Sequence, residues 1–325
     1  MHVEYRRVDW PFANPLRIAY ETTTTAKTLQ VELTDGSFVG RGEALGVSYR
    51  GETVDSMLIQ LRSIEGALVS GISRIELARL LPAGGARNAI DCALWDLEAK
   101  RKGERAWKLA GVPSVTHLTT DRTIGLDTPE NMAGVARALA RYPKLKLKLS
   151  GNGDLERVLA VRAARPDAEL IVDANQAWDE EQLRALAPRL AQAGVKLIEQ
   201  PLPAGKDSPL LEFNSPVPLC ADESCQTVES LSDLIGKYSY INIKLDKTGG
   251  LTEALRLANE ALRQHFRLMI GCMAGSSLSM APAFIVGQLC DFVDLDGPLL
   301  SASDIDHPIR YSGARMHPPE PMLWG

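Results

Sequence analysis

Five short apolar segments of the sequence end in or beside a charged residue: KLKLKL at 144–149, LIVDA at 170–174, KLIE at 196–199, LCAD at 219–222 and YINIKL at 240–245. Counted from Lys148 through Asp173, Glu199, Asp222 and Lys244, these charged residues lie 25, 26, 23 and 22 positions apart. One buried strand followed by one helix needs about this length of chain. The spacing therefore predicts repeated strand–helix units that close into a parallel α/β barrel.

Three further apolar runs, at 122–125, 268–271 and 292–295, bring the number of expected barrel strands to eight. The first part of the chain has a different pattern. Residues 28–33 and 38–43 alternate as antiparallel strands do, and they flank Asp35-Gly36, a strong hairpin signal. Residues 86–102 have helical periodicity and are followed by Gly103. We therefore expect an α+β region over residues 1–115.

The composition excludes several classes of protein. With 45% hydrophobic residues, 24% charged residues and a formal net charge of -5, the chain of 325 residues is typical of a globular protein that binds small molecules. It has no run of lysine and arginine, so nucleic acid is not an expected partner. The first residues resemble neither a signal peptide nor a membrane anchor, and the five cysteines never occur as C-x-x-C. We expect a cytoplasmic protein with reduced cysteines and no membrane partner.

Acidic residues at the ends of buried strands are the most informative feature. Parallel barrel strands are covered on both sides and are nearly all apolar, so a charged strand end needs an explanation. Asp173, Glu199 and Asp222 lie at the carboxyl ends of three adjacent expected strands, where barrel enzymes build their sites. Three oxygen ligands with no histidine among them favour Mg²⁺. One such acid alone would be explained as a helix cap or a loop residue. Three acids at equivalent positions on three adjacent strands predict a magnesium site.

Lysines flank this expected metal site. Lys146 and Lys148 are two positions apart on one strand, so both point into the barrel, and Lys244 enters from the opposite side. A metal-bound carboxylate substrate loses a proton from the adjacent carbon more easily, because the cation stabilises the negative charge that develops. A lysine whose pKa is lowered toward neutrality by neighbouring cations would act as the base. Lysines on opposite sides of the substrate carbon predict that its configuration is inverted. The alternative is that the lysines only form ion pairs with the three acids and take no part in catalysis.

The motifs that contain these residues resemble the muconate-lactonizing subgroup of the enolase superfamily. They are KLK at 146–148, VDAN at 172–175, IEQP at 198–201, ADES at 221–224 and NIKLDKTGG at 242–250. The resemblance implies an α/β fold, with a (β/α)7β TIM-like barrel at 116–299 as the catalytic domain. It also implies an α+β capping domain at 1–115, on which we expect the proline-rich tail at 300–325 to pack.

The same resemblance implies roles for the charged residues. The Mg²⁺ ligands would be the three strand-end acids, Asp173, Glu199 and Asp222. Lys148 and Lys244 would be the two acid/base residues, acting through an ene-diolate. Lys146 would tune Lys148 and approach the substrate carboxylate.

Asp294-Leu295-Asp296 on the eighth expected strand resembles the D-x-D motif of dipeptide epimerases, whose two acids hold the free ammonium group of the substrate. Two acids at a barrel mouth also suit a cation on charge grounds, although such a pair alone could be a solvated loop. Further similarity to the alanyl-glutamate epimerases of peptidoglycan recycling lies in ARNA at 86–89, DCALWD at 91–96 and GCM at 271–273. The resemblance thus implies an isomerase that inverts the α-carbon of the C-terminal residue of a dipeptide. Cys272 and Met273 would lie beside the substrate carboxylate.

One position departs from the family pattern. The glutamate-specific members carry an arginine where this chain has Thr23, and Arg17 is a nearby substitute in sequence. The second residue of the dipeptide therefore stays open. The alternatives are an o-succinylbenzoate synthase or N-acylamino acid racemase, which does not need Asp294 or Asp296, a non-catalytic dipeptide-binding barrel, and a Schiff-base aldolase. A homo-oligomeric assembly is left open as well.

Overall fold

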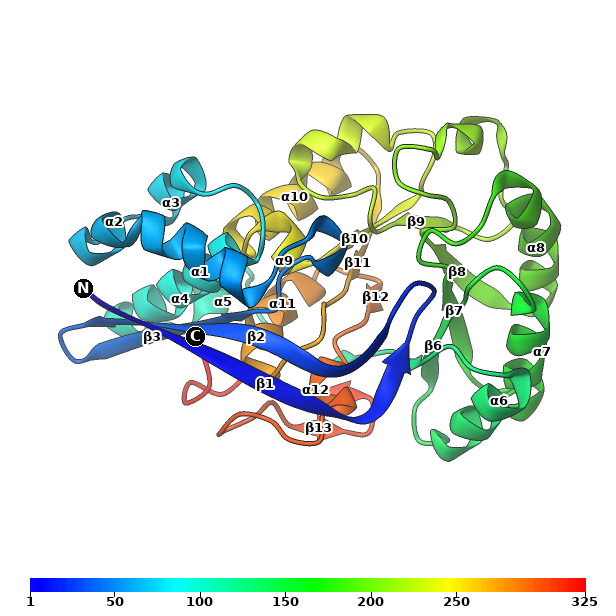
Figure 1. Cartoon of the computed structure of the whole chain (residues 1–325), viewed down its shortest axis with the longest axis horizontal. Coiled ribbons are helices and arrows are strands. Elements are labelled where there is room, and N and C mark those ends of the chain that lie inside the picture. Colours follow the sequence, from blue (N-terminus) through cyan, green and yellow to red (C-terminus); the bar gives the residue numbers. More distant parts are fainter.

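The computed structural model describes the whole chain, residues 1–325, and shows a curved sheet of eight parallel strands (Figure 1). The strands follow the chain order: β5 (Arg122–Ile124), β6 (Lys144–Lys148), β7 (Glu169–Asp173), β8 (Val195–Glu199), β9 (Leu219–Ala221), β10 (Tyr240–Ile243), β11 (Arg267–Ile270) and β12 (Phe292–Val293). Asp121 N, next to β5, donates a hydrogen bond to Val293 O on β12 at 2.7 Å, which joins the two ends of the sheet. The predicted barrel and its eight predicted strands are confirmed.

The inner face of the barrel explains why acids stand at the strand ends. A separate apolar cluster holds one buried side chain from each of six strands, namely Ile171, Leu197, Cys220, Tyr240, Met269 and Phe292. Side chains two positions apart on a strand share a face. The three strand-end acids each follow a member of this cluster by two positions, so they lie on the same inner face, nearer the carboxyl ends of the strands. An apolar layer therefore lies directly beneath the acids.

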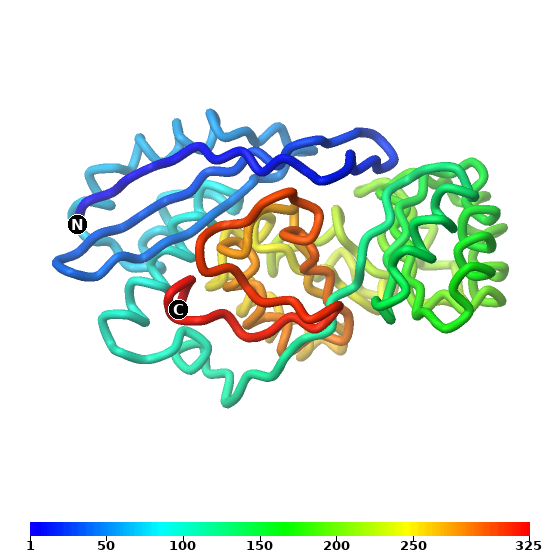
Figure 2. Tube along the Cα trace, turned by 90° about the horizontal axis from the view of Figure 1, so that it is seen from below, coloured from blue at the N-terminus to red at the C-terminus, as the bar shows by residue number.

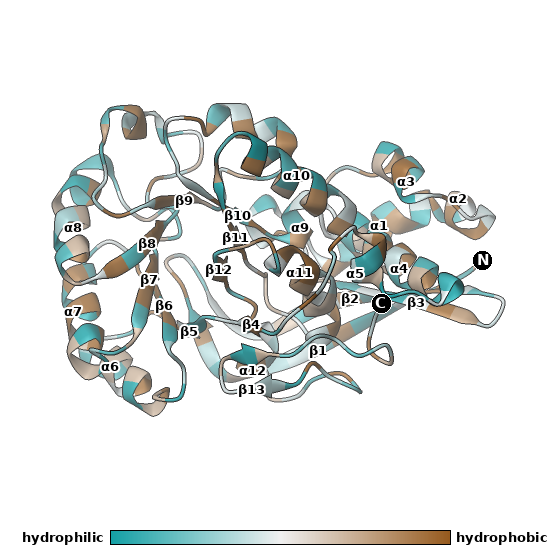
Figure 3. Cartoon of the chain, turned by 180° about the vertical axis from the view of Figure 1, so that it is seen from behind, coloured by the Kyte–Doolittle hydropathy of each residue, from teal (hydrophilic) through white to brown (hydrophobic).

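Helices cover the outside of the barrel, and Figure 3 shows hydrophobic residues concentrated on the strands and on α11. The helices of the barrel region are α6 (Pro129–Ala138), α7 (Asp154–Ala164), α8 (Glu180–Gln192), α10 (Leu251–Arg263) and α11 (Ser277–Gly287), together with two single turns directly after strand ends, α9 (Leu245–Thr248) and α12 (Gly297–Leu300). After β8 and β9, where the sequence predicted amphipathic helices, the chain forms only the 3-10 helices η2 (Ser208–Glu212) and η3 (Val228–Asp233). Five prolines between residues 201 and 218 prevent a regular helix after β8. None of the helices combines the length and the apolar character needed to cross a bilayer.

A second sheet of three antiparallel strands, β1 (His2–Arg17), β2 (Thr22–Asp35) and β3 (Phe38–Ala44), forms the N-terminal part of the molecule. It packs on α4 (Gly85–Lys102), beside η1 (Ser48–Arg50), α1 (Val54–Ser63), α2 (Glu65–Ser70) and α3 (Arg74–Leu80). Gly42 permits this packing, because a Cβ there would lie 2.0 Å from Ala89 O. The predicted hairpin and the helix that follows it are confirmed, within a separate α+β part.

The C-terminal tail, red in Figure 2, returns from the barrel to α4. The strands β13 (Tyr311–Ser312), β14 (Arg315–Met316) and β4 (Leu118–Thr119) form a third, small sheet. Trp324 Nε1 donates to Cys92 O at 3.1 Å, and Ala106 N, at the start of α5 (Ala106–Leu109), donates to Gly325 O at 3.1 Å. We keep the division into a cap at 1–115, a barrel at 116–299 and a returning tail at 300–325 as a proposal.

Buried charged residues join the N-terminal part to the barrel. Arg87 on α4 donates to Thr248 O at 2.6 Å and to Gly249 O at 3.2 Å, at the end of α9. Gly249 lies so close to Arg87 that a Cβ would be 2.3 Å from Nε, and its φ of +78° also favours glycine. Asp246 on α9 accepts a hydrogen bond from Gly46 N at 2.9 Å. The segment after β10 is therefore held in place from the N-terminal side.

We predict that Arg87→Met lowers the free energy of unfolding by about 2 to 4 kcal/mol, because three carbonyl oxygens, those of Leu81, Thr248 and Gly249, lose a charged donor. Urea denaturation followed by circular dichroism measures the change. Arg263→Met is the matched control, since Arg263 is exposed, pairs with Glu260 on its own helix and should leave stability nearly unchanged. Equal effects of the two substitutions would contradict the structural role of Arg87.

Candidate active site

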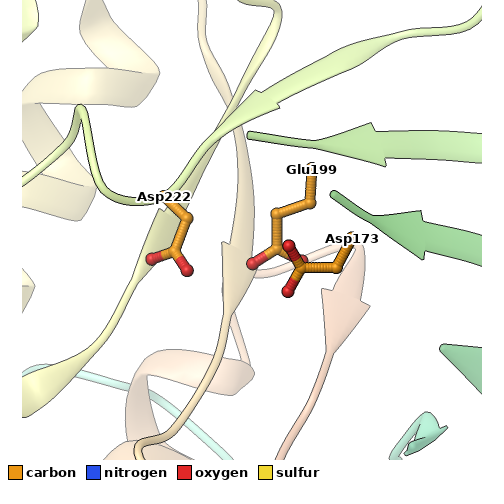
Figure 4. A group of neighbouring side chains, drawn as sticks. All are labelled: Asp173, Glu199 and Asp222. Carbon is orange, nitrogen blue, oxygen red and sulfur yellow. The ribbon is translucent and has the colours of Figure 1, made fainter. Parts of the chain in front are cut away.

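Three carboxylates meet at the carboxyl ends of neighbouring strands (Figure 4). Asp173 ends β7, Glu199 ends β8 and Asp222 directly follows β9. One oxygen from each lies within 4.8 Å of the others, and each residue is at most 1% exposed. The structure thus brings together the three acids that the sequence singled out.

Lysines stand at both ends of this carboxylate cluster. Lys148 Nζ, on β6, lies 2.6 Å from Asp173 Oδ2, and Lys244 Nζ, directly after β10, lies 2.6 Å from Asp222 Oδ2. Because β7, β8 and β9 lie between β6 and β10 in the sheet, the two ammonium groups approach the cluster from opposite ends. Both lysines line the cavity above the cluster.

Lys146 lies deeper than the other two lysines. It is 1% exposed, and its Nζ lies 2.7 Å from Glu199 Oε2 and 2.7 Å from Asp294 Oδ2. It does not belong to the wall of the cavity. Its direct contacts are therefore the acids, and its expected approach to a substrate carboxylate stays a prediction.

The charges in this cluster shift one another. Burial raises the pKa of Glu199 to about 7, and the neighbouring Asp173 adds to this effect. Burial would also raise the pKa of Asp173, but Lys148 and Lys146 lower it to about 2. Burial alone would lower the pKa of Lys244, yet the acids, Asp222 foremost, hold it well above its ordinary value. The carboxylates thus outweigh both burial and the neighbouring ammonium group at Lys244.

The carboxylate cluster fits a divalent cation. All three ligands are carboxylate oxygens, which Mg²⁺ prefers, and no nitrogen or sulfur ligand is among them. Glu199 Oε2 is buried and accepts no hydrogen bond, which leaves it free to bind a cation. The residues that would hold the cation are Asp173, Glu199 and Asp222.

Two further acids lie beside Lys146, after β12. Asp294 Oδ1 and Asp296 Oδ1 accept from Thr123 Oγ1 on β5 at 3.4 and 3.3 Å, so the two carboxylates converge on one point. Asp296 Oδ2 also accepts from Arg122 Nη1 and from Thr123 N, each at 2.8 Å. Burial, together with Asp294, raises the pKa of Asp296. The two Oδ1 atoms are held only by long bonds to one hydroxyl, so this pair can accept a cationic group.

A cavity of about 560 Å³ lies between the barrel and the N-terminal sheet. From the barrel it is lined by residues that include Lys148, Lys244, Asp222, Asp294, Asp296, Cys272 and Met273. From β2 it is lined by Thr23, Thr25 and Lys27, which alternate along the strand and so share one face. Arg17 is exposed near the end of the hairpin and is not part of the wall, so the structure does not make it a substitute for the missing arginine.

Several residues of the site received no role from the sequence. They are Arg122, Thr123, Asn175, Glu223, Asn242 and Lys247, which contact the acids or line the cavity. Asn242 carried a usable signal, because it is polar within a buried strand and stands two positions before Lys244. Arg122 and Lys247 carried none, because a lone basic residue is usually solvated.

Two family models cover most of the chain. Residues 1–111 match the N-terminal domain of the mandelate racemase/muconate lactonizing enzyme family, and residues 131–321 match the enolase C-terminal domain-like family. The chain therefore belongs to the mandelate racemase/muconate lactonizing enzyme family of the enolase superfamily. The family that the sequence motifs indicated is therefore confirmed.

Two curated relatives are similar over nearly their whole length. The chain is 43% identical to the L-Ala-D/L-Glu epimerase of Escherichia coli, over 95% of this chain and 97% of that protein. It is 41% identical to the N-acetyl-D-glutamate racemase of a Pseudoalteromonas species, over 91% of this chain and 94% of that protein. Both relatives are isomerases of amino acid derivatives.

Solved structures share the fold as well. An enolase family member from Agrobacterium tumefaciens, with bound sodium and L-Ala-L-Glu, has a TM-score of 0.97 and 42% identity, over 99% of both chains. A dipeptide epimerase from Methylococcus capsulatus, in complex with Mg and L-Arg-D-Lys, has a TM-score of 0.88 and 30% identity, over 98% of this chain and 97% of that chain. The dipeptides bound in these two structures thus differ in charge, since L-Ala-L-Glu has an acidic side chain and L-Arg-D-Lys has two basic ones.

The cysteine in the cavity wall should be an inert thiol. Burial, followed by the charges of Asp294 and Asp296, raises the pKa of Cys272 to about 12. At pH 8 its thiolate fraction is therefore on the order of 10³-fold below that of an ordinary cysteine. We predict a correspondingly slow reaction of Cys272 with iodoacetamide at pH 8, followed by peptide mass spectrometry. The urea-unfolded chain is the control, and labelling as fast in the native protein would refute the assignment.

Proposed function

We propose that this protein is a Mg²⁺-dependent dipeptide epimerase, which inverts the α-carbon of the C-terminal residue of its substrate. The observation that carries this proposal is the placement of Lys148 and Lys244 at opposite ends of the carboxylate cluster. Groups placed in this way can exchange protons with the two faces of one carbon. The E. coli relative named L-Ala-D/L-Glu epimerase and the Methylococcus structure with Mg and a dipeptide support the proposal.

In the proposed reaction one lysine, in its neutral form, removes the α-hydrogen as a proton from one face of the carbon. The electron pair of the broken C–H bond moves into the substrate carboxylate. The other lysine, as an ammonium group, then delivers its proton to the opposite face, so a C–H bond of inverted configuration forms. Mg²⁺ held by the three acids would stabilise the negative charge that develops on the substrate carboxylate.

Asp294 and Asp296 would bind the free ammonium group of the dipeptide. Their Oδ1 atoms converge on Thr123 in the wall of the cavity. An N-acyl amino acid has no ammonium group, so this acid pair favours a dipeptide. The Pseudoalteromonas relative nevertheless makes N-acyl amino acid racemisation the second candidate function. That reaction would use the same lysines and leave the acid pair without a partner.

Lys27 is a candidate for recognising the second residue of the dipeptide. The cavity wall contains four cationic side chains, of which Arg7, Lys148 and Lys244 form ion pairs with acids. Lys27 forms none and lies on the same strand face as Thr23, where the glutamate-specific members are expected to carry arginine. We therefore propose a dipeptide with an acidic second residue, such as the L-Ala-L-Glu bound in the Agrobacterium structure.

The cellular setting is also a proposal. All five cysteines are free, which supports a reducing compartment such as the cytoplasm. A part in peptidoglycan recycling rests on the resemblance to alanyl-glutamate epimerases.

We predict that the protein with Mg²⁺ exchanges the α-hydrogen of the second residue of L-Ala-L-Glu in D₂O and produces the epimer. Lys148→Ala and Lys244→Ala should each lower epimerisation by about 10²- to 10⁴-fold, because one of the two proton carriers is lost. Each variant should still exchange one epimer without inversion, and the two variants should differ in which epimer that is. Proton NMR of both epimers measures exchange and inversion together.

The wild-type protein with N-acetylglutamate is the comparison in this experiment. Exchange of that compound alone would replace the dipeptide function with the second candidate. Binding of the dipeptide without any exchange would make the protein a non-catalytic binding barrel. Exchange that survives removal of divalent ions by EDTA would exclude the metal-assisted reaction.

We predict that Lys27→Met lowers kcat/KM for L-Ala-L-Glu by about five-fold, the effect of one partly exposed ion pair, and leaves L-Ala-L-Leu unchanged. Lys196→Met is the matched control, since Lys196 is exposed on β8 and is absent from the cavity wall. If Lys27→Met lowers the turnover of both dipeptides equally, Lys27 does not recognise the charge on the side chain of the second residue. A wild-type preference for L-Ala-L-Leu or L-Ala-L-Lys would refute the acidic substrate class.

A further inference from the structure

A fourth lysine is buried behind the carboxylate cluster. Lys247 on α9 is fully buried, and its Nζ donates to Asp222 Oδ1 at 2.6 Å, to Asp222 O at 2.6 Å and to Asn242 O at 2.9 Å. It is absent from the cavity wall, in contrast to Lys148 and Lys244. Lys247 is therefore placed to hold Asp222 and not to contact a substrate.

The three acids share one pattern of contacts. Each has one oxygen held by a donor of the protein frame, while its other oxygen faces an ammonium group of the site. The frame donors are Asn175 N on Asp173 Oδ1 at 2.9 Å, Asn242 Nδ2 on Glu199 Oε1 at 2.7 Å and Lys247 Nζ on Asp222 Oδ1 at 2.6 Å. The ammonium contacts are Lys148 on Asp173 Oδ2 at 2.6 Å, Lys146 on Glu199 Oε2 at 2.7 Å and Lys244 on Asp222 Oδ2 at 2.6 Å.

This pattern defines which oxygens a cation can use. One oxygen of each acid is held by the protein frame, whereas the other contacts only lysine ammonium groups, so a cation that displaces these groups would meet one oxygen of each acid. Only Asp222 has a charged frame donor, because Asn175 and Asn242 provide a neutral amide. Asp222 is also the acid whose remaining oxygen pairs with Lys244, a proposed proton carrier.

We infer that Lys247 is a positioning residue, which keeps Asp222 a one-oxygen ligand and serves as its permanent counter-ion. With Lys247 in place, Lys244 can leave Asp222 Oδ2 and turn toward the substrate, since Asp222 retains a charged partner. Without Lys247, both oxygens of Asp222 are open to Lys244, and the two side chains pair more tightly. This inference rests on the proposed metal site.

The fold fixes the position of Lys247 from outside the barrel. Lys247 N and Thr248 N both donate to Lys244 O, which makes α9 a single turn between the two lysines. Arg87 donates to Thr248 O and Gly249 O at the other end of that turn. The orientation of Lys247 is therefore set by the same contact that joins the N-terminal part to the barrel.

A crystal structure of the wild-type protein with Mg²⁺ tests the inference directly. We expect one oxygen of Asp222 on the metal, Lys247 Nζ still on the other oxygen, and Lys244 Nζ no longer in contact with Asp222. Coordination of the metal by both oxygens of Asp222, or displacement of Lys247, overturns the inference and leaves the proposed function intact. A failure of Mg²⁺ to bind the three acids overturns the proposed function as well.

Calorimetry on substitution variants tests the role without using activity. We expect Lys247→Met to weaken Mg²⁺ binding by about 10- to 100-fold, as loss of a residue that orients a ligand does. At saturating Mg²⁺, kcat should fall while KM for the dipeptide changes little, because Lys244 stays on Asp222. Lys237→Met is the matched control, since Lys237 pairs with Asp207 at 2.8 Å outside the site.

Lys247→Gln provides a second variant in case the methionine variant does not fold, because it retains a donor without the charge. It should also bind Mg²⁺ at least about 10-fold more weakly, since the amide is shorter and neutral. Wild-type affinity in either folded variant contradicts the inference.

Discussion

Mutual repulsion among three buried carboxylates is the constraint on which the rest of the structure depends. Unit charges 4.8 Å apart repel by roughly 3 kcal/mol per pair at an effective dielectric constant of about 20. Three such pairs approach the whole stability of a typical domain, which is about 5 to 15 kcal/mol. The barrel therefore has to supply positive charge and hydrogen-bond donors at this place. Lys146, Lys148, Lys244 and Lys247 meet that need, because each of them pairs with one of the three acids.

The same constraint explains how the barrel is layered. The apolar side chains below the acids exclude water, which strengthens every ion pair above them. Asp294, which pairs with Lys146, extends the network of charges to the end of β12. Its hydrogen bond from Thr123 connects that network to β5, the strand at the other end of the sheet. Opposite charges are thus arranged in a ring on one rim of the barrel, and the cavity opens onto that ring. A single rim holds the groups that we propose for metal binding, proton transfer and ammonium recognition.

The barrel and the charged centre of its rim could be predicted from the sequence, because both follow from regular spacing. Strand-end residues such as Asp173 and Glu199 break an apolar pattern at equal intervals, and period-two alternation gives their common face. The supporting residues could not be predicted in this way, because their roles depend on contacts between separate segments. Lys247 resembles any surface lysine until the structure shows it buried against Asp222 and Asn242, and the exclusion of Arg17 from the cavity depends on how the hairpin lies.

The contacts that hold the N-terminal part to the barrel also fix one wall of the cavity. Its base is fixed by Arg87 and by the buried Glu43, which accepts from Ser276 N at 2.7 Å across the joint. Near the tip of the β1–β2 hairpin, the backbone is held by Leu126 N donating to Arg17 O at 2.8 Å. Residues 18, 20 and 21, at the tip of this hairpin, line the cavity. Because the N-terminal part is held to the barrel both at its base and near the hairpin tip, the two walls of the cavity keep a fixed spacing.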